Sequence, residues 1–309
     1  MTKATLSLHG NPIRATVGQA IAIARAEPPG PVHLDLPEDI ALSMQSDFTA
    51  APDETSRLAD LSGEIVRTLS SALMRSRRPL LITGLSFTRS RATADLLKFV
   101  ENQSLPFVTT MHAKGFLPEN HSHWAGVIGR ARRSDVKRFT DRADLIVAVG
   151  YDPIEINYED WARNIPIVHI NTEAAEPGDG LKFLWNNPCD LAAAIEAIGT
   201  IEPSANDWST QEWQKHRSLL DRALRPDGAS FAAHQVLDVL REQFPPDGIL
   251  AYDVGAHTHQ IATQWRTDVP RTLLSTNGWS SMGYGMPAAY AAKLVHPARA
   301  VVAIVGDGG

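Results

Sequence analysis

Residues 79–110 read PLLITGLSFTRSRATADLLKFVENQSLPFVTT, and this stretch decides the class of fold. Apolar runs of strand length stand at its two ends, 79–83 and 107–110. Between the runs, apolar residues recur at the spacing of one helical face: Ala92, Leu96, Phe99 and Val100. A strand, a helix and a second strand in this order predict a βαβ unit, whose two strands are parallel.

The same alternation continues along the middle of the chain. A helical pattern precedes the stretch, and strand-length apolar runs follow it at 144–150 and 165–170. Strands that alternate with helices predict a parallel sheet with helices on both faces. We therefore expect an α/β fold with a complete Rossmann-like central domain at 57–200.

The two flanking segments are each too short for a domain of this kind. Residues 1–45 offer one helical pattern and one strand, and a polar linker follows them. Residues 226–309 offer a helix and then three strands, at 248–252, 272–275 and 300–305. We expect two partial domains around the complete one, the first ending at 45 and the second beginning at 226.

Composition and charge narrow the class of protein. The formal net charge of −6 argues against a broad nucleic-acid surface. Cys189 is the only cysteine, so an intramolecular disulfide is excluded and a reducing compartment fits. The sequence also shows neither a signal peptide nor an apolar run long enough to span a bilayer. We expect a cytoplasmic protein with neither a nucleic acid nor a membrane as partner.

The last nine residues, VVAIVGDGG, place an acid between glycines directly after a strand. In parallel sheets, ligands bind at the carboxyl ends of strands, and glycines let the backbone approach them. Asp307 could therefore hold a Mg²⁺ ion, which commonly takes one or two carboxylates. Taken alone, an ordinary Asp-Gly turn explains the same residues.

Two further loops carry similar signals. Residues 253–259, DVGAHTH, follow a strand and open a helix, so their amides could bind a phosphate. Residues 277–287, NGWSSMGYGMP, form a glycine-rich loop before an alanine-rich helix. Three such loops in one small block predict one shared ligand site.

Rival patterns explain the block less well. Gly283-x-Gly285-x-x-Ala288 matches the dinucleotide fingerprint, with Asp307 as the ribose-binding acid, but the preceding strand is several residues away and Pro287 interrupts the loop. His257-x-His259 has a metal-site spacing, although two polar residues at a helix start explain it as well. The sequence has no Gly-x-Ser-x-Gly elbow, and we interpret Cys189 as structural.

Together these loops resemble the thiamine-diphosphate-dependent enzymes, especially the acetolactate synthases and 2-oxoacid decarboxylases. The resemblance covers nearly the whole chain. Residues 29–39 resemble the end of the pyrimidine-binding domain, 57–200 the central domain and 226–309 the diphosphate-binding domain. We therefore expect thiamine-diphosphate-binding folds in both partial domains.

The resemblance implies the following site. Asp307 is the first metal ligand, Met282 props the cofactor in its bent shape, and the Ser280 carbonyl accepts a hydrogen bond from the cofactor's amino group. Many relatives have glycine where Ser280 stands. The other implied cofactor contacts are Val254, Gly255, Ala256, His257, Gly283, Gly306, Gly308 and Gly309.

The implied cofactors are thiamine diphosphate and Mg²⁺, and the implied reaction is decarboxylation and carboligation of a 2-oxo acid such as pyruvate, in a homodimer or homotetramer. The family's catalytic glutamate and second metal ligand match no residue here, so we name no catalytic residue and expect an inactive fragment lacking both ends. A related decarboxylase or acyltransferase remains an alternative. So does a non-catalytic remnant that serves dimerisation or nucleotide binding.

The loop after 144–150 bears on a further cofactor. Residues 150–155, GYDPIE, resemble the catabolic acetolactate synthases. Biosynthetic members usually carry an arginine-bearing segment here, and Ile156 stands at the corresponding position. FAD is therefore not expected, although Met282 also occurs in biosynthetic members.

Overall fold

The structure is a computed structural model that describes residues 2–42, 44, 58–156, 162, 164–176, 180–228, 231–276 and 280–307. The chain divides into two compact units, Met1–Ala59 and Asp60–Gly309. Each unit is described by itself below. The boundaries predicted at 45, 57, 200 and 226 remain predictions.

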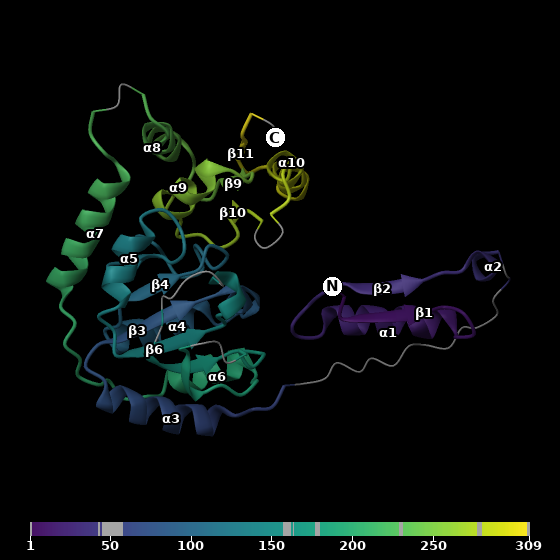
Figure 1. Cartoon of the computed structure of the whole chain (residues 1–309), viewed down its shortest axis with the longest axis horizontal. Helices are drawn as coiled ribbons and strands as arrows, with labels where there is room; N and C mark the ends of the chain where they lie inside the picture. The colour runs from purple at the N-terminus through teal and green to yellow at the C-terminus, as the bar shows by residue number, and fades with distance from the viewer. Residues whose placement is uncertain are drawn as a thin grey trace. The chain divides into compact units, whose positions relative to one another are not determined.

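The first unit is a small βαβ motif. Strands β1 (Ala4–Ser7) and β2 (Val32–Asp35) pair in parallel, with Ala4 opposite Val32. Helix α1 (Ile13–Arg25) connects them and packs against both strands (Figure 1). The short helix α2 (Glu38–Ala41) follows β2. Because the described residues of this unit form only two strands, they bury little apolar surface.

The centre of the second unit is a six-stranded, all-parallel sheet in the order β5-β4-β3-β6-β7-β8. Its strands are β3 (Pro79–Thr83), β4 (Phe107–Thr109), β5 (Trp124–Val127), β6 (Leu145–Val149), β7 (Pro166–Ile170) and β8 (Lys182–Trp185). The strands β3 and β6 are buried along their whole length, as expected when helices cover both faces of a parallel sheet.

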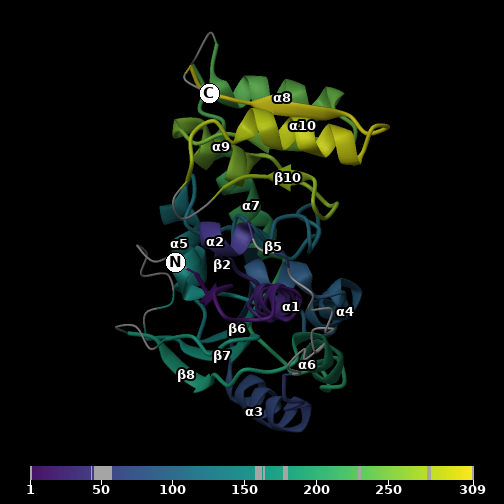
Figure 2. The same ribbon diagram turned by 90° about the vertical axis from the view of Figure 1, so that its right-hand side faces the viewer.

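Helices cover both faces of this sheet. One group packs together on one side, and α5 packs with α7 on the other (Figure 2). The first group is α3 (Ser62–Arg75), α4 (Thr93–Asn102) and α6 (Leu191–Ile198); the second is α5 (Arg133–Thr140) and α7 (Thr210–Leu224). Two short 3₁₀ helices follow β3 and β6, namely η1 (Leu85–Arg89) and η2 (Pro153–Ile156).

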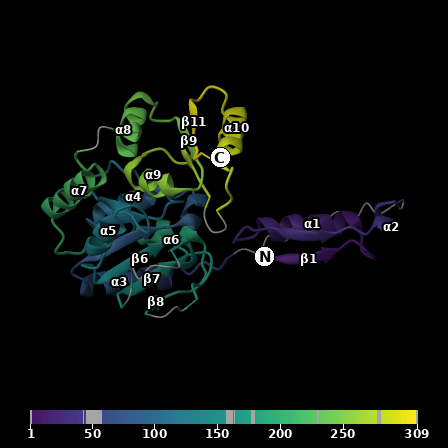
Figure 3. The ribbon, with the colours of Figure 1, turned by 45° about the horizontal axis from the view of Figure 1, so that its top comes forward.

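A second, three-stranded parallel sheet completes this unit, in the order β10-β9-β11. Its elements are α8 (Ala233–Gln243), β9 (Ile249–Tyr252), α9 (Ala256–Gln264), β10 (Leu273–Leu274), α10 (Gly285–Val295) and β11 (Val301–Ile304). Helices α8 and α9 share a core with one face of β9, while α10 covers the other face (Figure 3). The predicted α/β class, with parallel sheets, is confirmed.

The strands expected from apolar runs are all present, and each ends within two residues of its expected position. Three strands without such a run were missed: β1, β5 and β8. Strand β5 contains Gly126, and β8 exposes Lys182 and Leu184 at the edge of the sheet. Neither composition gives the apolar run of a buried strand.

A buried ion pair joins the central sheet to the second sheet. Lys114 Nζ lies 2.7 Å from both carboxylate oxygens of Glu119, and both side chains are almost wholly buried. Glu119 Oε2 also accepts the N–H of Thr267, 2.9 Å away, in the loop that leads into β10. Burial lowers the pKa of Lys114 and raises that of Glu119, while their mutual attraction opposes both shifts.

Backbone atoms of the two segments that meet at this ion pair are also in close contact. Gly115 has φ of +77°, and a Cβ there would lie 2.7 Å from the carbonyl oxygen of Val269. Asn120 donates its N–H and its side-chain amide to the Asp268 carboxylate, each over 2.9 Å. The segment between β4 and β5 thus lies directly against the segment between α9 and β10.

Among the residues that the structure describes, no helix is both long and apolar enough to cross a membrane.

Removing one member of the buried pair should destabilise the protein far more than removing both. We expect Lys114→Met or Glu119→Leu alone to lower the free energy of unfolding by about 3–5 kcal/mol, because each leaves an uncompensated buried charge. The double variant should cost clearly less than the sum of the two. Urea denaturation of the four proteins measures these differences.

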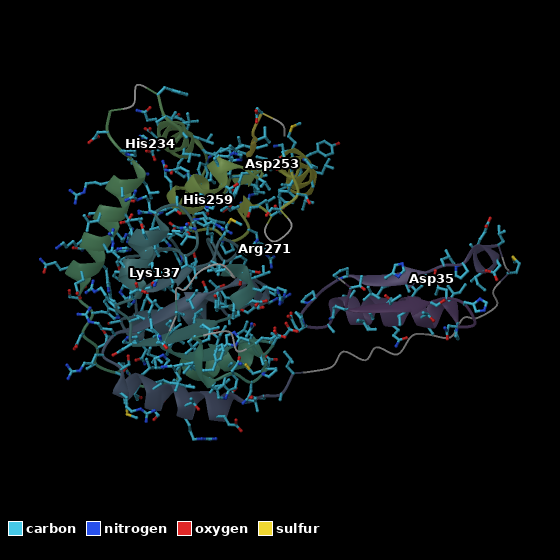
Figure 4. The ribbon with its side chains drawn as sticks, in the orientation of Figure 1. Asp35, Lys137, His234, Asp253, His259 and Arg271 are labelled. Atoms are coloured by element: carbon cyan, nitrogen blue, oxygen red, sulfur yellow. The ribbon has the colours of Figure 1, made fainter. Side chains whose placement is uncertain are left out.

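The matched control is the exposed pair of Lys137 on α5 and Asp141 directly after it, where Lys137 is marked in Figure 4. Its variants should change the free energy of unfolding by less than about 1 kcal/mol. Additive losses from Lys114→Met and Glu119→Leu would show that the two side chains do not act as a pair.

Candidate functional site

The loops singled out in the sequence lie at one edge of the second sheet. Because β9, β10 and β11 are parallel, their carboxyl ends meet at this edge. Tyr252 at the end of β9 lies opposite Ile304 at the end of β11. The residues that follow each strand therefore lie close together, as the three-loop pattern predicts.

Asp253 holds the first two loops together. Its Oδ1 accepts the N–H of Val254 over 2.7 Å, and its Oδ2 accepts the N–H of Gly283 over 2.8 Å. Figure 4 marks Asp253 at the end of β9. Backbone donors, first that of Val254, hold the pKa of this carboxyl below its usual value, so it is ionised at neutral pH. Asp253 was not among the predicted site residues.

At two positions of the second loop the backbone geometry or the packing favours glycine. Gly283 has φ of +76°, a left-handed conformation that favours glycine. A Cβ on Gly285 would lie 3.0 Å from the backbone N of Asp253, so the absence of a side chain lets α10 approach β9. The residues 275–284 separate β10 from α10. The tight strand-to-helix turn of a dinucleotide fingerprint is therefore missing.

Some backbone N–H groups of the first loop, residues 253–259, already form hydrogen bonds within the protein. The N–H of Val254 bonds Asp253, and the N–H of Gly255 bonds Thr258 Oγ1 over 3.1 Å. The next two N–H groups, of Ala256 and His257, belong to the first turn of α9, where no intrahelical acceptor exists. Of the four predicted backbone contacts, these two are the ones the fold leaves for a ligand.

His257 connects the first loop to the third. Its Cε1 lies 2.9 Å from where a Cβ on Gly255 would stand and 3.9 Å from the corresponding position on Gly306. Its Nε2 is buried and has no hydrogen-bond partner among the described groups. An orphaned polar atom at the meeting point of two strand-end loops fits a site that receives a polar ligand.

A cavity of about 220 Å³ lies at this sheet edge. Among the predicted residues, Val254, Gly255 and Ser280 line it. The other residues around it are Met111, Arg130, Tyr252, Asp253, Thr258, His259 and Thr276. Figure 4 marks His259 on α9. The lining thus combines polar groups of the second sheet with a cation, Arg130, from the segment after β5.

Arg130 reaches the cavity because its segment docks on α9. The N–H of Ala131 bonds the carbonyl of His259 over 3.3 Å, and the hydroxyl of Thr263 bonds the carbonyl of Ala131 over 3.1 Å. Nothing in the sequence pattern could have indicated this position. More than 120 residues separate Arg130 from the loop it faces.

The remaining predicted residues that the structure describes do not line the cavity. Met282 is 74% exposed, and Gly306 and the predicted metal ligand Asp307 are exposed after β11. Ser280 has φ of 45°, a conformation that favours glycine at this position. Gly308 and Gly309 lie outside the described residues.

The other candidate chemistries find no support in the described part of the chain. No group of three or more His, Cys, Asp or Glu side chains that could hold a metal gathers there. Cys189 is fully buried, and burial raises the pKa of its thiol to about 12. A thiol in that state is not a nucleophile at neutral pH.

The fold and the site together define an α/β protein with a polar-lined cavity at the carboxyl edge of a parallel sheet. Two family models match the chain: "Thiamine pyrophosphate enzyme, central domain" over residues 66–197 and "Thiamine pyrophosphate enzyme, C-terminal TPP binding domain" over residues 253–309. The chain therefore belongs to the thiamine pyrophosphate enzymes.

Among curated proteins, the chain is similar to acetolactate synthase large subunits. It is 28% identical to that of Lactococcus lactis over 95% of this chain and 52% of the relative. It is 29% identical to that of Parasynechococcus marenigrum over 94% and 49%, and 27% identical to the probable subunit of Methanocaldococcus jannaschii over 96% and 54%. The chain spans about half the length of the curated relatives it matches.

Replacing Asp253 by asparagine should destabilise the protein in a pH-dependent way. The asparagine amide cannot accept from both N–H groups, so the loops after β9 and before α10 lose a shared anchor. Because the folded pKa lies below the unfolded value of about 3.9, the stabilisation is full above that value. It is lost as the pH falls through the folded pKa.

Urea denaturation between about pH 3 and pH 7 should therefore show a gap between wild type and Asp253→Asn that narrows on the acid side. Asp227→Asn, at an exposed aspartate in a turn, is the matched control and should show little gap at any pH. A gap for Asp253→Asn that stays constant down to pH 3 would contradict the assignment.

Proposed function

We propose that these 309 residues belong to a thiamine-diphosphate- and Mg²⁺-dependent enzyme that decarboxylates a 2-oxo acid such as pyruvate and joins the product to a second 2-oxo acid. The observation that carries the proposal is the meeting of three strand-end loops at one sheet edge, where residues of the first two loops line a cavity within segments that match the family models. The relatives named acetolactate synthase support carboligation over simple decarboxylation.

The residues present fit the cofactor. The N–H groups of Ala256 and His257 would bind the diphosphate, and Asp307 would contribute a carboxylate to Mg²⁺. The Ser280 carbonyl would accept a hydrogen bond from the aminopyrimidine, and the exposed Met282 would support the bent cofactor. When bound, thiamine diphosphate supplies the carbon nucleophile and the electron sink for decarboxylation.

Arg130 adds a permanent positive charge to the cavity wall. An arginine beside the diphosphate loop favours anions, both the cofactor's phosphates and the carboxylate of a 2-oxo acid. The Asp253 carboxylate also lines the cavity, but its two oxygens already accept backbone N–H groups, which leaves the Arg130 guanidinium as the charged donor of the lining. We infer that Arg130 selects for an anionic ligand in this site.

The active unit is proposed to be a homodimer or homotetramer in the cytoplasm. Support comes from α10 and the turn before it, where apolar residues at four-residue spacing are exposed: Met282, Met286, Tyr290 and Leu294. Such a row marks a surface that another protein surface covers. A second copy of the same chain is the occupant most consistent with a family of self-associating enzymes.

The test is turnover of pyruvate by the protein purified from its complete reading frame, with thiamine diphosphate and Mg²⁺. We expect acetolactate rather than acetaldehyde as the main product. Asp307→Asn should abolish activity by weakening Mg²⁺ binding, and Arg130→Met should raise the KM for pyruvate or weaken cofactor binding several-fold. Asp227→Asn is the matched control and should leave turnover unchanged. Light scattering on the same samples reports the oligomeric state.

Acetaldehyde as the main product would favour the decarboxylase alternative. Full activity of Asp307→Asn would contradict the metal assignment. The 309 residues assayed alone should show no turnover and little thermal stabilisation by the cofactor, because no residue of the sequence matches the family's catalytic glutamate or second metal ligand. A shift of several degrees would show that the loops present suffice for binding.

A further inference from the structure

The central sheet has a second place where a ligand would be expected. The chain runs from β3 outward to β4 and β5, then returns to the middle and runs from β6 outward to β7 and β8. The order therefore reverses between β3 and β6. In open parallel sheets, nucleotides bind outside the carboxyl ends of the strands at such a switch point.

In this protein the side chain of Glu155 lies at the switch point, between the loop after β3 and the loop after β6. Glu155, in the 3₁₀ helix η2 after β6, turns its carboxylate towards the loop after β3. Its Oε1 accepts the N–H of Leu85 over 2.9 Å and the N–H of Asp152 over 3.2 Å. Its Oε2 lies 3.6 Å from Nδ1 of His112, and its side chain is 4% exposed.

The loops on either side close around this carboxylate. A Cβ on Gly84 would lie 2.5 Å from Glu155 Oε1, and a Cβ on Gly150 would lie 2.2 Å from the backbone N of Phe87. The N–H of Ser86 bonds the Gly150 carbonyl over 2.9 Å. The loop after β3 thus packs directly on the loop after β6, where a nucleotide would need a crevice.

We propose that Glu155 is a built-in anion that occupies the switch point and closes the central sheet to phosphate-bearing nucleotides such as ADP, FAD or NAD. Its carboxylate accepts backbone N–H groups that a phosphate would otherwise seek. Its negative charge, in a buried setting of low dielectric, repels any phosphate that approaches. The central domain then serves as a rigid support rather than as a dinucleotide site.

This inference does not rest on the proposed enzymatic activity, and its test uses the 309-residue chain alone. The melting temperature is measured with and without ADP, and with and without formate, for wild type, Glu155→Ala and Glu155→Gln. Glu196→Ala, at an exposed glutamate on α6, is the matched control. Formate is a carboxylate small enough to enter the hole left by the Glu155 side chain.

Wild type should be unaffected by ADP and by formate. Glu155→Ala should melt roughly 4 to 10 °C lower, because two partly buried N–H groups lose their acceptor and a buried carboxylate is replaced by a hole, and formate should restore part of that loss. Glu155→Gln should lie between the two, since its carbonyl oxygen still accepts from Leu85 and Asp152. Glu196→Ala should behave as wild type does.

Saturable stabilisation of the wild type by ADP would overturn the proposal. An unchanged melting temperature of Glu155→Ala, or a response to formate equal in all four proteins, would overturn it as well. If Glu155→Ala is recovered unfolded, the wild-type titration with ADP and the loss in Glu155→Gln still decide the outcome.

Discussion

The candidate site depends on the contact between Lys114 and Glu119, because this pair fixes one sheet of the second unit against the other. Glu119 Oε2 accepts the N–H of Thr267, in the loop that leads into β10. The same segment, from the end of β4 to the start of α5, supplies Met111 and Arg130 to the cavity. Neither charge of the pair could stay buried without the other. This desolvated pair therefore acts together with the Asn120–Asp268 and Ala131–His259 contacts to hold the segment that carries Met111 and Arg130 against the second sheet.

Carboxylates that accept backbone N–H groups recur through the second unit. Glu119 does so at the junction, Asp253 at the sheet edge and Glu155 at the switch point. Asp144 accepts the N–H groups of Arg77 and Arg78, each over 2.8 Å, where the chain passes from α3 into β3. In every case the donors lie outside the hydrogen-bond ladder of a sheet, in a loop or at the start of a short helix. A charged acceptor forms a stronger hydrogen bond than a neutral one, so one side chain can hold a whole loop.

Local patterns predicted the regular elements well and the irregular ones poorly. Strands such as 79–83 and 145–149 are buried on both faces, so their apolar runs are unmistakable. Strand β8 at the sheet edge exposes alternate residues, and β5 carries a glycine, so neither gives that run. Helix α5, rich in charged residues, was also missed, because its buried face consists only of Val136, Phe139 and Thr140. Where a strand or helix is partly exposed to solvent, polar residues interrupt its apolar pattern and the element is harder to predict.

The sequence by itself determined the alternation of buried strands and helices, the parallel sheets and the three strand-end loops, because each is a local consequence of apolar spacing and glycine placement. Only the tertiary structure decided that Asp253 joins two loops, that Arg130 faces them from another sheet and that Glu155 fills the switch point. These contacts link residues far apart in the chain, such as Asp253 and Gly283 or Leu85 and Glu155. A sequence pattern reports what surrounds each residue along the chain, whereas a carboxylate accepts whichever donor the packed fold brings within about 3 Å.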